Sequence, residues 1–450
     1  MTNKIAITLI AAAAILTSCA DPSSERSAAP RHDIGTTPTT TATAPSDPGG
    51  RWLRGDADRD WSGGGEGFGG DSAGGAATEA YAAEDAASLR STAKPAAGAP
   101  APPTTLVPGD VIAPPQRSGP GLRAGSVDDN AAFADYLKYR DEFRRLGITV
   151  HDIDVSVRHV VTVVDQDGKP LLGAVVRGGD QEVRTGPDGR ALLFGNVGGA
   201  DVRYGDSTAA VDFAQGSREH RVSFPIRRPE GRAKLDVLFL IDTTGSMGDE
   251  IDRLKDSVRS VAERISALPE GADLRLGMTV YRDRGDLFVT RTFDFTSRVD
   301  VFKTALAEVR AGGGGDTPED LNAGLHQAVT SPSWRGGDTV KLIFLIADAP
   351  PHLDYPDGPD YADDVRAAAR RGIKVMPIAS SGLDDQGEYV FRQLAQITMA
   401  RFTFLTYGAD GASPGDHTEH HVSDYAVLAL DDLVVRLVAD ELRPLGSGGQ

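Results

Sequence analysis

The chain has 450 residues, 40% of them apolar, and a formal net charge of −18 at pH 7. This length exceeds one ordinary domain and leaves room for two or three. The negative charge argues against a nucleic-acid partner, since the phosphate backbone would be repelled. With Cys19 as the single cysteine, no disulfide can form within the chain.

The first nineteen residues read as a targeting segment. Lys4 precedes an apolar stretch, residues 5–16, that is too short to span a bilayer comfortably. The following "LTSC" resembles the lipobox of bacterial lipoproteins, which implies a signal peptide over 1–19, lipidation of Cys19 and a cell-envelope location. Ala20 replaces the aspartate that retains such proteins at the inner membrane, so the resemblance favours the outer membrane or the cell surface. An ordinary signal peptide with an incidental cysteine is the alternative.

Residues 20–125 are rich in Pro, Gly, Ser, Thr and Ala, as in "TTPTTTATAPSDPGG". Such composition offers too little apolar surface to offset ordering, so we expect a disordered tether. The "DADRD" within it lacks the glycine and glutamate of a calcium-binding loop, and two "RGD" tripeptides are attributed to chance. We expect a helical segment at residues 126–148, because Phe133, Leu137 and Phe143 have helical spacing before Gly147.

Residues 149–228 predict a small β-sandwich. β-Branched runs alternate with Asp-Gly, Gly-Gly and Pro-Asp-Gly turns. The stretch "VVDQDGKPLLGAVV", followed by "TGPDGRALLF", resembles carboxypeptidase-regulatory-like and related immunoglobulin-like domains. That resemblance implies a spacer or docking module without a catalytic site.

Residues 233–445 predict an α/β domain. The continuous apolar runs "LDVLFLI" and "VKLIFLIAD" are typical of buried parallel strands, and amphipathic helices alternate with them. The predicted fold class is therefore a doubly wound, mostly parallel open sheet, preceded by the sandwich and the tether. "LRLGMTVY" and "FVTRTFDF" predict a hairpin at a sheet edge.

Hard oxygen donors follow the two central strands. Asp242, Thr244 and Ser246 end the first strand, and Asp348 ends the second. The glycine loop "AGGGGDTPED" precedes a helix and should approach the same edge, where ligands bind in such sheets. Carboxylates and hydroxyls are ligands that a hard divalent cation prefers, so the sequence predicts a cation site there.

The same residues resemble the metal-ion-dependent adhesion site of von Willebrand factor type A domains. The resemblance implies Mg²⁺ (or Mn²⁺) held by Asp242, Thr244, Ser246, Asp348 and a residue of the second loop. "DTPED" resembles the integrin β-subunit version of that loop, which implies Glu319 as the ligand, with Thr317 as the runner-up. By the same resemblance, further sites are implied for Ca²⁺. Their candidate ligands are Asp249 and Glu250 for one site and Asp316 for the other.

The resemblance also implies a function. A metal with one open coordination position takes a carboxylate oxygen, so the expected partner is a protein presenting Asp or Glu. The envelope protein would then act in adhesion or assembly and would not be an enzyme.

Three alternatives compete with this function. In a structural protein the metal only braces the fold. A serine hydrolase would use Ser246, Asp348 and His352, but the Gly-x-Ser-x-Gly elbow is absent. Zinc could bind the histidines of "HTEHH", although no acid or cysteine is marked to complete that site, so a solvated loop is favoured. That loop contains His417, His420 and His421.

Overall fold

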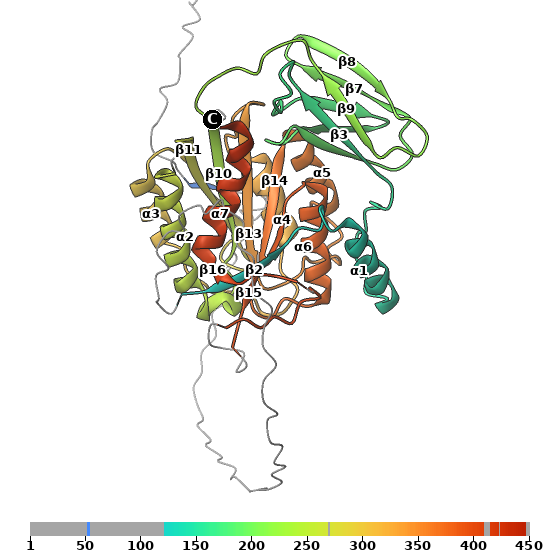
Figure 1. Cartoon of the computed structure of the whole chain (residues 1–450). Coiled ribbons are helices and arrows are strands. Elements are labelled where there is room, and N and C mark those ends of the chain that lie inside the picture. The colour runs from blue at the N-terminus through green and yellow to red at the C-terminus, as the bar shows by residue number, and fades with distance from the viewer. Residues whose placement is uncertain (1–51, 55–120, 269–270, 409–414, 423, 447–450) are drawn as a thin grey trace, which may run out of the picture. The chain divides into compact units, whose positions relative to one another are not determined.

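The computed structural model describes residues 52–54, 121–268, 271–408, 415–422 and 424–446. The expected signal peptide, Cys19 and most of the expected tether lie outside these residues. The described part contains one large sheet, two small sheets and the helices that cover them (Figure 1). None of its helices combines the length and apolar character that crossing a lipid bilayer requires.

The large sheet has nine strands in the order β1-β12-β11-β10-β13-β14-β15-β2-β16. Its five central strands, β11-β10-β13-β14-β15, pair in parallel. The pairings outside them, β1 with β12, β12 with β11, β15 with β2 and β2 with β16, are antiparallel. This confirms the expected fold class. The strands are β1 (Trp52–Arg54), β2 (Arg123–Val127), β10 (Lys234–Asp242), β11 (Asp273–Tyr281), β12 (Thr290–Thr296), β13 (Thr339–Ala347), β14 (Ile373–Ala379), β15 (Phe402–Thr406) and β16 (Leu428–Ala429).

Burial on both faces explains the continuous apolar runs. Every residue of β13 is buried, and so is every residue of β10 except Lys234. The helices that cover the sheet form two groups, one with α2, α3 and α7 and one with α4, α5 and α6 (Figure 1). They are α2 (Ile251–Ser266), α3 (Val299–Ala307), α4 (Leu321–Thr330), α5 (Tyr361–Arg371), α6 (Asp385–Ile397) and α7 (Leu430–Leu442).

The chain reverses its direction of travel across the sheet between β10 and β13. From β10 it continues to β11 on one side, and from β13 it continues to β14 on the other. Connections after the two strands therefore diverge at their carboxyl ends and leave a crevice there. Asp242 and the residues after Ala347 lie at this crevice.

Strands from the first third of the chain join both sides of this sheet. β1 pairs with β12, within a range that composition assigned to the tether. β2 pairs with β15 and β16 and crosses the expected tether boundary at residue 125. The large sheet thus includes segments on both sides of the sandwich in sequence.

The sandwich consists of two small sheets around a separate apolar cluster. One sheet has the order β6-β3-β9 and the other β5-β4-β7-β8. Val161, Val176, Leu193 and Val202 contribute to this cluster from strands of both sheets. The strands are β3 (Arg158–Val164), β4 (Val175–Gly178), β5 (Gln181–Arg184), β6 (Arg190–Phe194), β7 (Gly199–Tyr204), β8 (Ser207–Asp212) and β9 (Glu219–Ser223).

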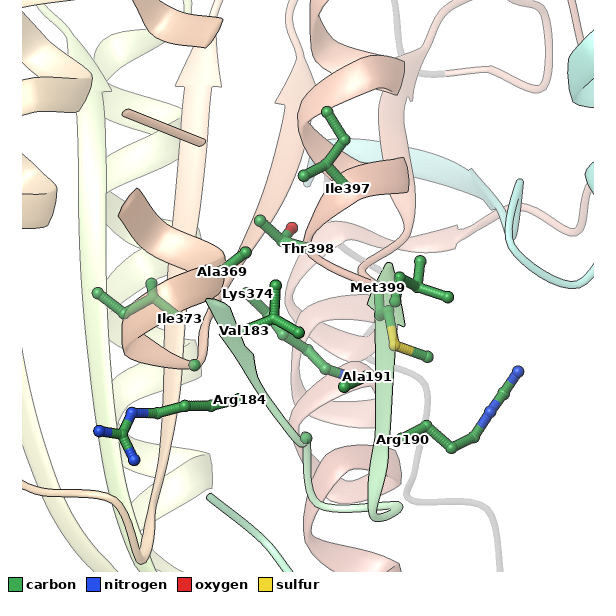
Figure 2. A pocket seen from close by; sticks show the side chains of 13 residues that line it. Val183, Arg184, Arg190, Ala191, Ala369, Ile373, Lys374, Ile397, Thr398 and Met399 are labelled. Atoms are coloured by element: carbon green, nitrogen blue, oxygen red, sulfur yellow. The ribbon is translucent and has the colours of Figure 1, made fainter. Parts of the chain in front are cut away.

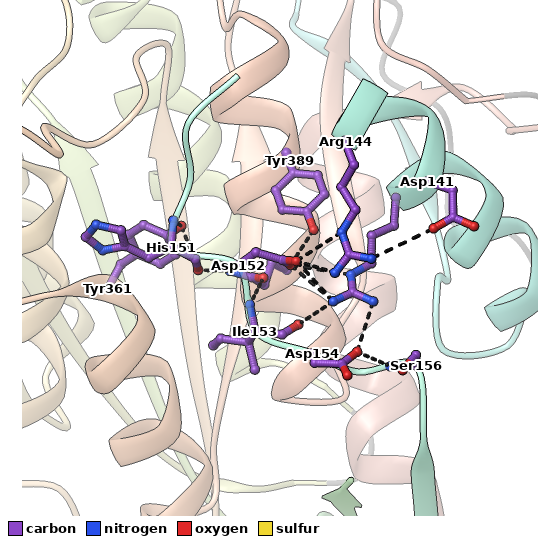
Figure 3. Close-up of polar contacts among 11 residues, drawn as sticks. Asp141, Arg144, His151, Asp152, Ile153, Asp154, Ser156, Tyr361 and Tyr389 are labelled. Carbon is purple, nitrogen blue, oxygen red and sulfur yellow. Dashed lines mark hydrogen bonds and ion pairs between the residues drawn. The ribbon is translucent and has the colours of Figure 1, made fainter. Parts of the chain in front are cut away.

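Helix α1 (Phe133–Leu146) ends at Gly147, as expected, with a left-handed φ of 71°. Its buried face differs from the expected apolar stripe, because it includes the charged Arg140 beside Tyr136 and Tyr139. Arg140 donates to Asp152. Asp152 also accepts from Arg144 and from the hydroxyl of Tyr389 on α6, as Figure 3 shows. The paired charges allow the guanidinium to be buried.

A small cavity of about 30 Å³ lies between the sandwich and the α/β domain (Figure 2). Its walls include Val183 and Ala191 from the sandwich and Ile373, Lys374 and Met399 from the α/β domain. Ile373 and Lys374 are the first residues of β14. This cavity is therefore at the opposite end of the strands from the crevice, and it has room for about one water molecule.

Candidate metal centre

The loop after β10 forms the floor of the site. Thr244 donates its backbone N–H and its hydroxyl to Asp242 Oδ1, at 2.9 and 2.7 Å. Its hydroxyl oxygen also lies 3.2 Å from Ser246 Oγ. Asp242 and Thr244 are fully buried, whereas Ser246 is exposed. The three oxygen donors therefore lead from the interior to the surface.

Asp348 directly follows β13 and reaches the same crevice. It is 9% exposed, and its electrostatic neighbours include Asp242, Glu250 and the hydroxyl of Ser246. Asp242 and Asp348 thus follow neighbouring parallel strands and act on each other electrostatically.

The glycine loop lies against the β10 loop through backbone hydrogen bonds. Gly245 N–H donates to Gly313 O at 2.9 Å, and Gly312 N–H donates to Thr243 O at 3.0 Å. Gly314 has a left-handed φ of 63°, and a Cβ there would lie 2.6 Å from Glu319 Oε1. Only glycine gives the backbone this close approach without strain.

Glu319 is the second-loop residue that the structure brings to the site. It is 2% exposed and is electrostatically coupled to Asp242, and its carboxylate interacts with the hydroxyl of Thr244. Thr317, the runner-up, has an exposed side chain, as does Asp316. The backbone of Glu319 is held by bonds to Pro350 and His352, just beyond Asp348.

Two acids of this region were missed by sequence reasoning. Asp286 Oδ2 accepts the backbone N–H of Gly314 at 2.9 Å, and Asp283 acts electrostatically on Glu319. Both lie in the loop that follows β11. A parallel arrangement of β11 and β10 would have predicted these two acids, because the loop after β11 must then leave the sheet at the same edge as the loop after β10. Asp286 belongs to one of the tripeptides attributed to chance.

The electrostatics show an excess of negative charge. Burial, together with Asp348, raises the pKa of Asp242 to about 7. Burial, together with Asp242 and Asp283, raises the pKa of Glu319 to about 8. Burial also raises the pKa of Asp348, although the Ser246 hydroxyl counteracts it. Polar interactions of the Thr244 and Tyr281 side chains with Asp242, and of Thr244 with Glu319, counteract these increases only in part.

Three carboxylate oxygens in this region have no hydrogen-bond partner. Oδ2 of Asp242, Oε2 of Glu319 and Oδ1 of Asp348 are buried and have no hydrogen-bond partner. Such atoms are costly unless a ligand satisfies them. Among the described residues, no group of three or more His, Cys, Asp and Glu side chains forms a metal cage by itself. The other hard oxygen donors beside these carboxylates are the hydroxyls of Thr244 and Ser246.

The residues expected at adjacent calcium sites have other surroundings. Glu250 is buried and accepts hydrogen bonds from Ser381 and from Tyr407, the latter at 2.7 Å. Its Oε2 remains without a partner. The side chain of Asp249 lies outside what the structure describes.

The hydrolase arrangement is not assembled. His352 Nδ1 lies 2.7 Å from Asp354 and its ring stacks on Tyr355, whereas Ser246 interacts with Thr244 and Asp348. Among the contacts of the described residues, none joins Ser246 to an imidazole.

The histidine-rich loop packs on helix α6. His421 Nδ1 lies 3.1 Å from Glu388 Oε2, and His420 Nδ1 lies 3.4 Å from the same atom. We expected this loop to be solvated. Instead, His420 and His421 contact Glu388, an acid that is remote in sequence. No metal cage is found here in the described part of the chain.

The fold and the site together define an open α/β domain with oxygen donors gathered at its switch point. Residues 236–400 match the family model described as von Willebrand factor A domain. The chain therefore contains such a domain. These domains generally mediate protein–protein interaction and often bind a metal at this kind of site.

Two curated proteins match part of the chain. The alpha-protein kinase vwkA of Dictyostelium discoideum is 34% identical over 146 residues, which cover 31% of this chain and 22% of that protein. The putative ariadne-like RING finger protein R811 of Acanthamoeba polyphaga mimivirus is 29% identical over 126 residues, which cover 27% of this chain and 12% of that protein. The chain thus spans less than a quarter of either relative.

Proposed function

We propose that the chain is a metal-dependent protein-binding module and not an enzyme. Asp242, Thr244, Ser246, Glu319 and Asp348 would hold Mg²⁺ or Mn²⁺. The bound ion supplies a positive charge with a position open to an oxygen ligand, and the exposed Ser246 lies where a partner would approach. The expected ligand is an Asp or Glu side chain of another protein.

One observation carries this proposal. Three buried carboxylates from three loops each keep one oxygen without a hydrogen-bond partner, beside two hydroxyls. A fold that only needed stability would pair such groups with cations or donors. The match of residues 236–400 to the von Willebrand factor A domain, a type of domain that generally mediates protein–protein interaction, supports the same proposal.

Calorimetry with Mg²⁺ alone tests the metal. The parent chain should release or absorb heat on binding, and at a hundred times the dissociation constant Mg²⁺ should stabilise it by about 2.7 kcal/mol. Asp242→Asn should abolish both effects. Asp256→Asn on the exposed face of α2 is the matched control and should bind as the parent does. Equal Mg²⁺ binding by Asp242→Asn and the parent would reject this site.

The ligand residue of the second loop can be decided in the same way. Glu319→Gln should remove most of the Mg²⁺ heat, whereas Thr317→Val should retain it, because Glu319 is buried beside Thr244 and Thr317 is exposed. The reverse pattern would make Thr317 the ligand.

A metal that only braces the fold is the second candidate, and the buried position of Asp242 and Thr244 favours it. Panning of a displayed peptide library in Mg²⁺ and in EDTA separates the two. A binding module should select peptides with a shared Asp or Glu only when Mg²⁺ is present. A structural metal would stabilise the chain without any such selection.

We also propose attachment to the cell envelope through a lipid on Cys19, supported by the "LTSC" stretch after a short apolar segment. In a bacterium that processes lipoproteins, the parent should incorporate labelled palmitate and fractionate with membranes. Cys19→Ala should lose the label. Unchanged labelling and fractionation of the variant would reject the anchor.

A further inference from the structure

The outer edge of the large sheet is occupied by a short strand from early in the chain. β1 pairs antiparallel with β12, with Trp52 opposite Phe293, Leu53 opposite Thr292 and Arg54 opposite Arg291. Without β1, the last strand on this side would be β12, and its outward N–H and C=O groups would be unpaired.

This edge is close to the metal centre along the backbone. β12 and β11 form a hairpin in which Thr290 pairs with Tyr281. The connecting loop, residues 282–289, carries Asp286, whose carboxylate accepts the N–H of Gly314. The glycine loop in turn lies against Glu319 and Thr244. A strand that braces β12 therefore also restrains the hairpin that positions the glycine loop.

The pairing is small enough to be reversible. It covers three residue pairs, and each hydrogen bond contributes about 0.5–1.5 kcal/mol net. Against this stands the entropy of closing a long chain segment, since residues 55–120 connect β1 to β2 on the other side of the sheet. Elements with so few contacts belong to the parts of a protein that open most readily.

We propose that the outer edge of β12 is a strand-docking site whose occupant is the chain's own Trp52–Arg54, and that docking strengthens metal binding through the hairpin and Asp286. The second part rests on the proposed function of the metal centre. The docked strand thus links the amino-terminal region to the affinity of the site for its cation.

Hydrogen–deuterium exchange on the full chain tests docking. Successive N–H groups of a strand point alternately toward and away from the neighbouring strand. The double substitution Trp52→Pro and Leu53→Pro therefore removes one N–H that faces β12, whichever of the two residues points that way. The matched control is Ser88→Pro with Leu89→Pro, in the Ser-Leu-Arg stretch at 88–90, which shares its Leu-Arg with Leu53 and Arg54. We expect exchange at residues 291–293 to be about tenfold faster in the Trp52/Leu53 variant only.

Calorimetry on the same proteins tests the link to the metal. The Trp52/Leu53 variant should bind Mg²⁺ about fivefold more weakly than the parent and the control. Exchange at residues 291–293 that is equal in variant and parent would overturn docking. Faster exchange with unchanged Mg²⁺ affinity would overturn the link. If even the parent binds no Mg²⁺, the proposed function fails, and exchange alone decides docking.

A second copy of the chain is the competing source of the strand. Measuring exchange of the parent at two protein concentrations tenfold apart distinguishes the sources. Docking within one chain predicts equal protection of residues 291–293 at both concentrations. Protection that increases with concentration would overturn docking by the chain's own segment.

Discussion

Two buried groups of acids in this protein have opposite electrostatics. At the metal centre, the pKa values of Asp242 and Glu319 are raised to about 7 and about 8. On helix α6, Glu388 is equally buried, but the hydrogen bond and charge of His420 and the charge of Arg392 outweigh burial and lower its pKa to about 2.

The difference is in the partners. Arg392 donates to Asp129 at 2.7 and 2.9 Å and to Glu388 at 3.1 Å, and its guanidinium lies 3.7 Å from the Tyr139 ring centre. At the metal centre, Arg282 acts on Asp242 through its charge, but among the hydrogen bonds of the described residues none runs from an arginine or lysine to Asp242 or Glu319. Burial alone thus does not mark a functional acid. Burial without a hydrogen-bonded cation is what makes Asp242 and Glu319 candidates for binding a ligand.

The largest expected effect comes from removing the compensating cation. Arg392→Met leaves Asp129 and Glu388 buried without their partner and should lower the free energy of unfolding by about 3–5 kcal/mol. Urea denaturation of the full chain measures it. Arg366→Met, on a half-exposed pair with Asp363, should change it by less than about 0.5 kcal/mol. Similar losses in both variants would remove the distinction drawn above.

Lowering the pH should remove the contribution of Glu388 to the free energy of unfolding. A carboxylate whose pKa is lowered on folding stabilises the protein above its unfolded pKa, and this stabilisation is lost as the pH falls through the folded value. Glu388→Gln should therefore be less stable than the parent by roughly 2–3 kcal/mol at pH 7, and the difference should shrink between pH 5 and pH 2. A difference that does not depend on pH would refute the assigned shift.

Raising the pH should remove the contribution of the metal-centre carboxylates to the free energy of unfolding. A carboxylate whose pKa is raised on folding favours the folded state at low pH, and this contribution is lost as the pH rises through the folded value. In EDTA, the free energy of unfolding should fall on the order of 1–2 kcal/mol more between pH 6 and pH 9 in the parent than in Asp242→Asn. Thermal melts across that range measure it, and identical slopes would contradict it.

The smallest expected effect tests the close approach of the glycine loop. Gly314→Ala would place a Cβ 2.6 Å from Glu319 Oε1 in a left-handed backbone, which should weaken Mg²⁺ binding by about 1 kcal/mol. A Cβ on Gly315 would meet no atom within 4 Å, so Gly315→Ala is the matched control. Calorimetry should separate the two variants, and equal affinities would mean that the approach does not matter for the site.

Sequence periodicity anticipated the sheet and its site where signals were local. Continuous apolar runs located β10 and β13, and the acids at their ends located the crevice. Asp283 and Asp286 were missed because their strand was assigned to an edge hairpin, although it is also parallel to β10. The partnership of Glu388 with His421 joins residues far apart in sequence, and no local pattern encodes it.

Strand β1 was missed for a different reason. Three residues among Pro- and Gly-rich tracts show no periodicity, so composition dominated the interpretation. The segment is extended because it pairs with the edge of β12. The conformation is therefore specified by its neighbour more than by its own residues.

The position of β2 has a consequence for biosynthesis. β2 precedes the sandwich in the chain but pairs with β15 and β16, which are among the last strands to leave the ribosome. The sandwich strands β3 to β9 are contiguous and can assemble while translation continues. The α/β domain must instead hold its early strand unpaired until synthesis is nearly finished, so premature termination after β14 would yield a folded sandwich attached to an unfinished sheet.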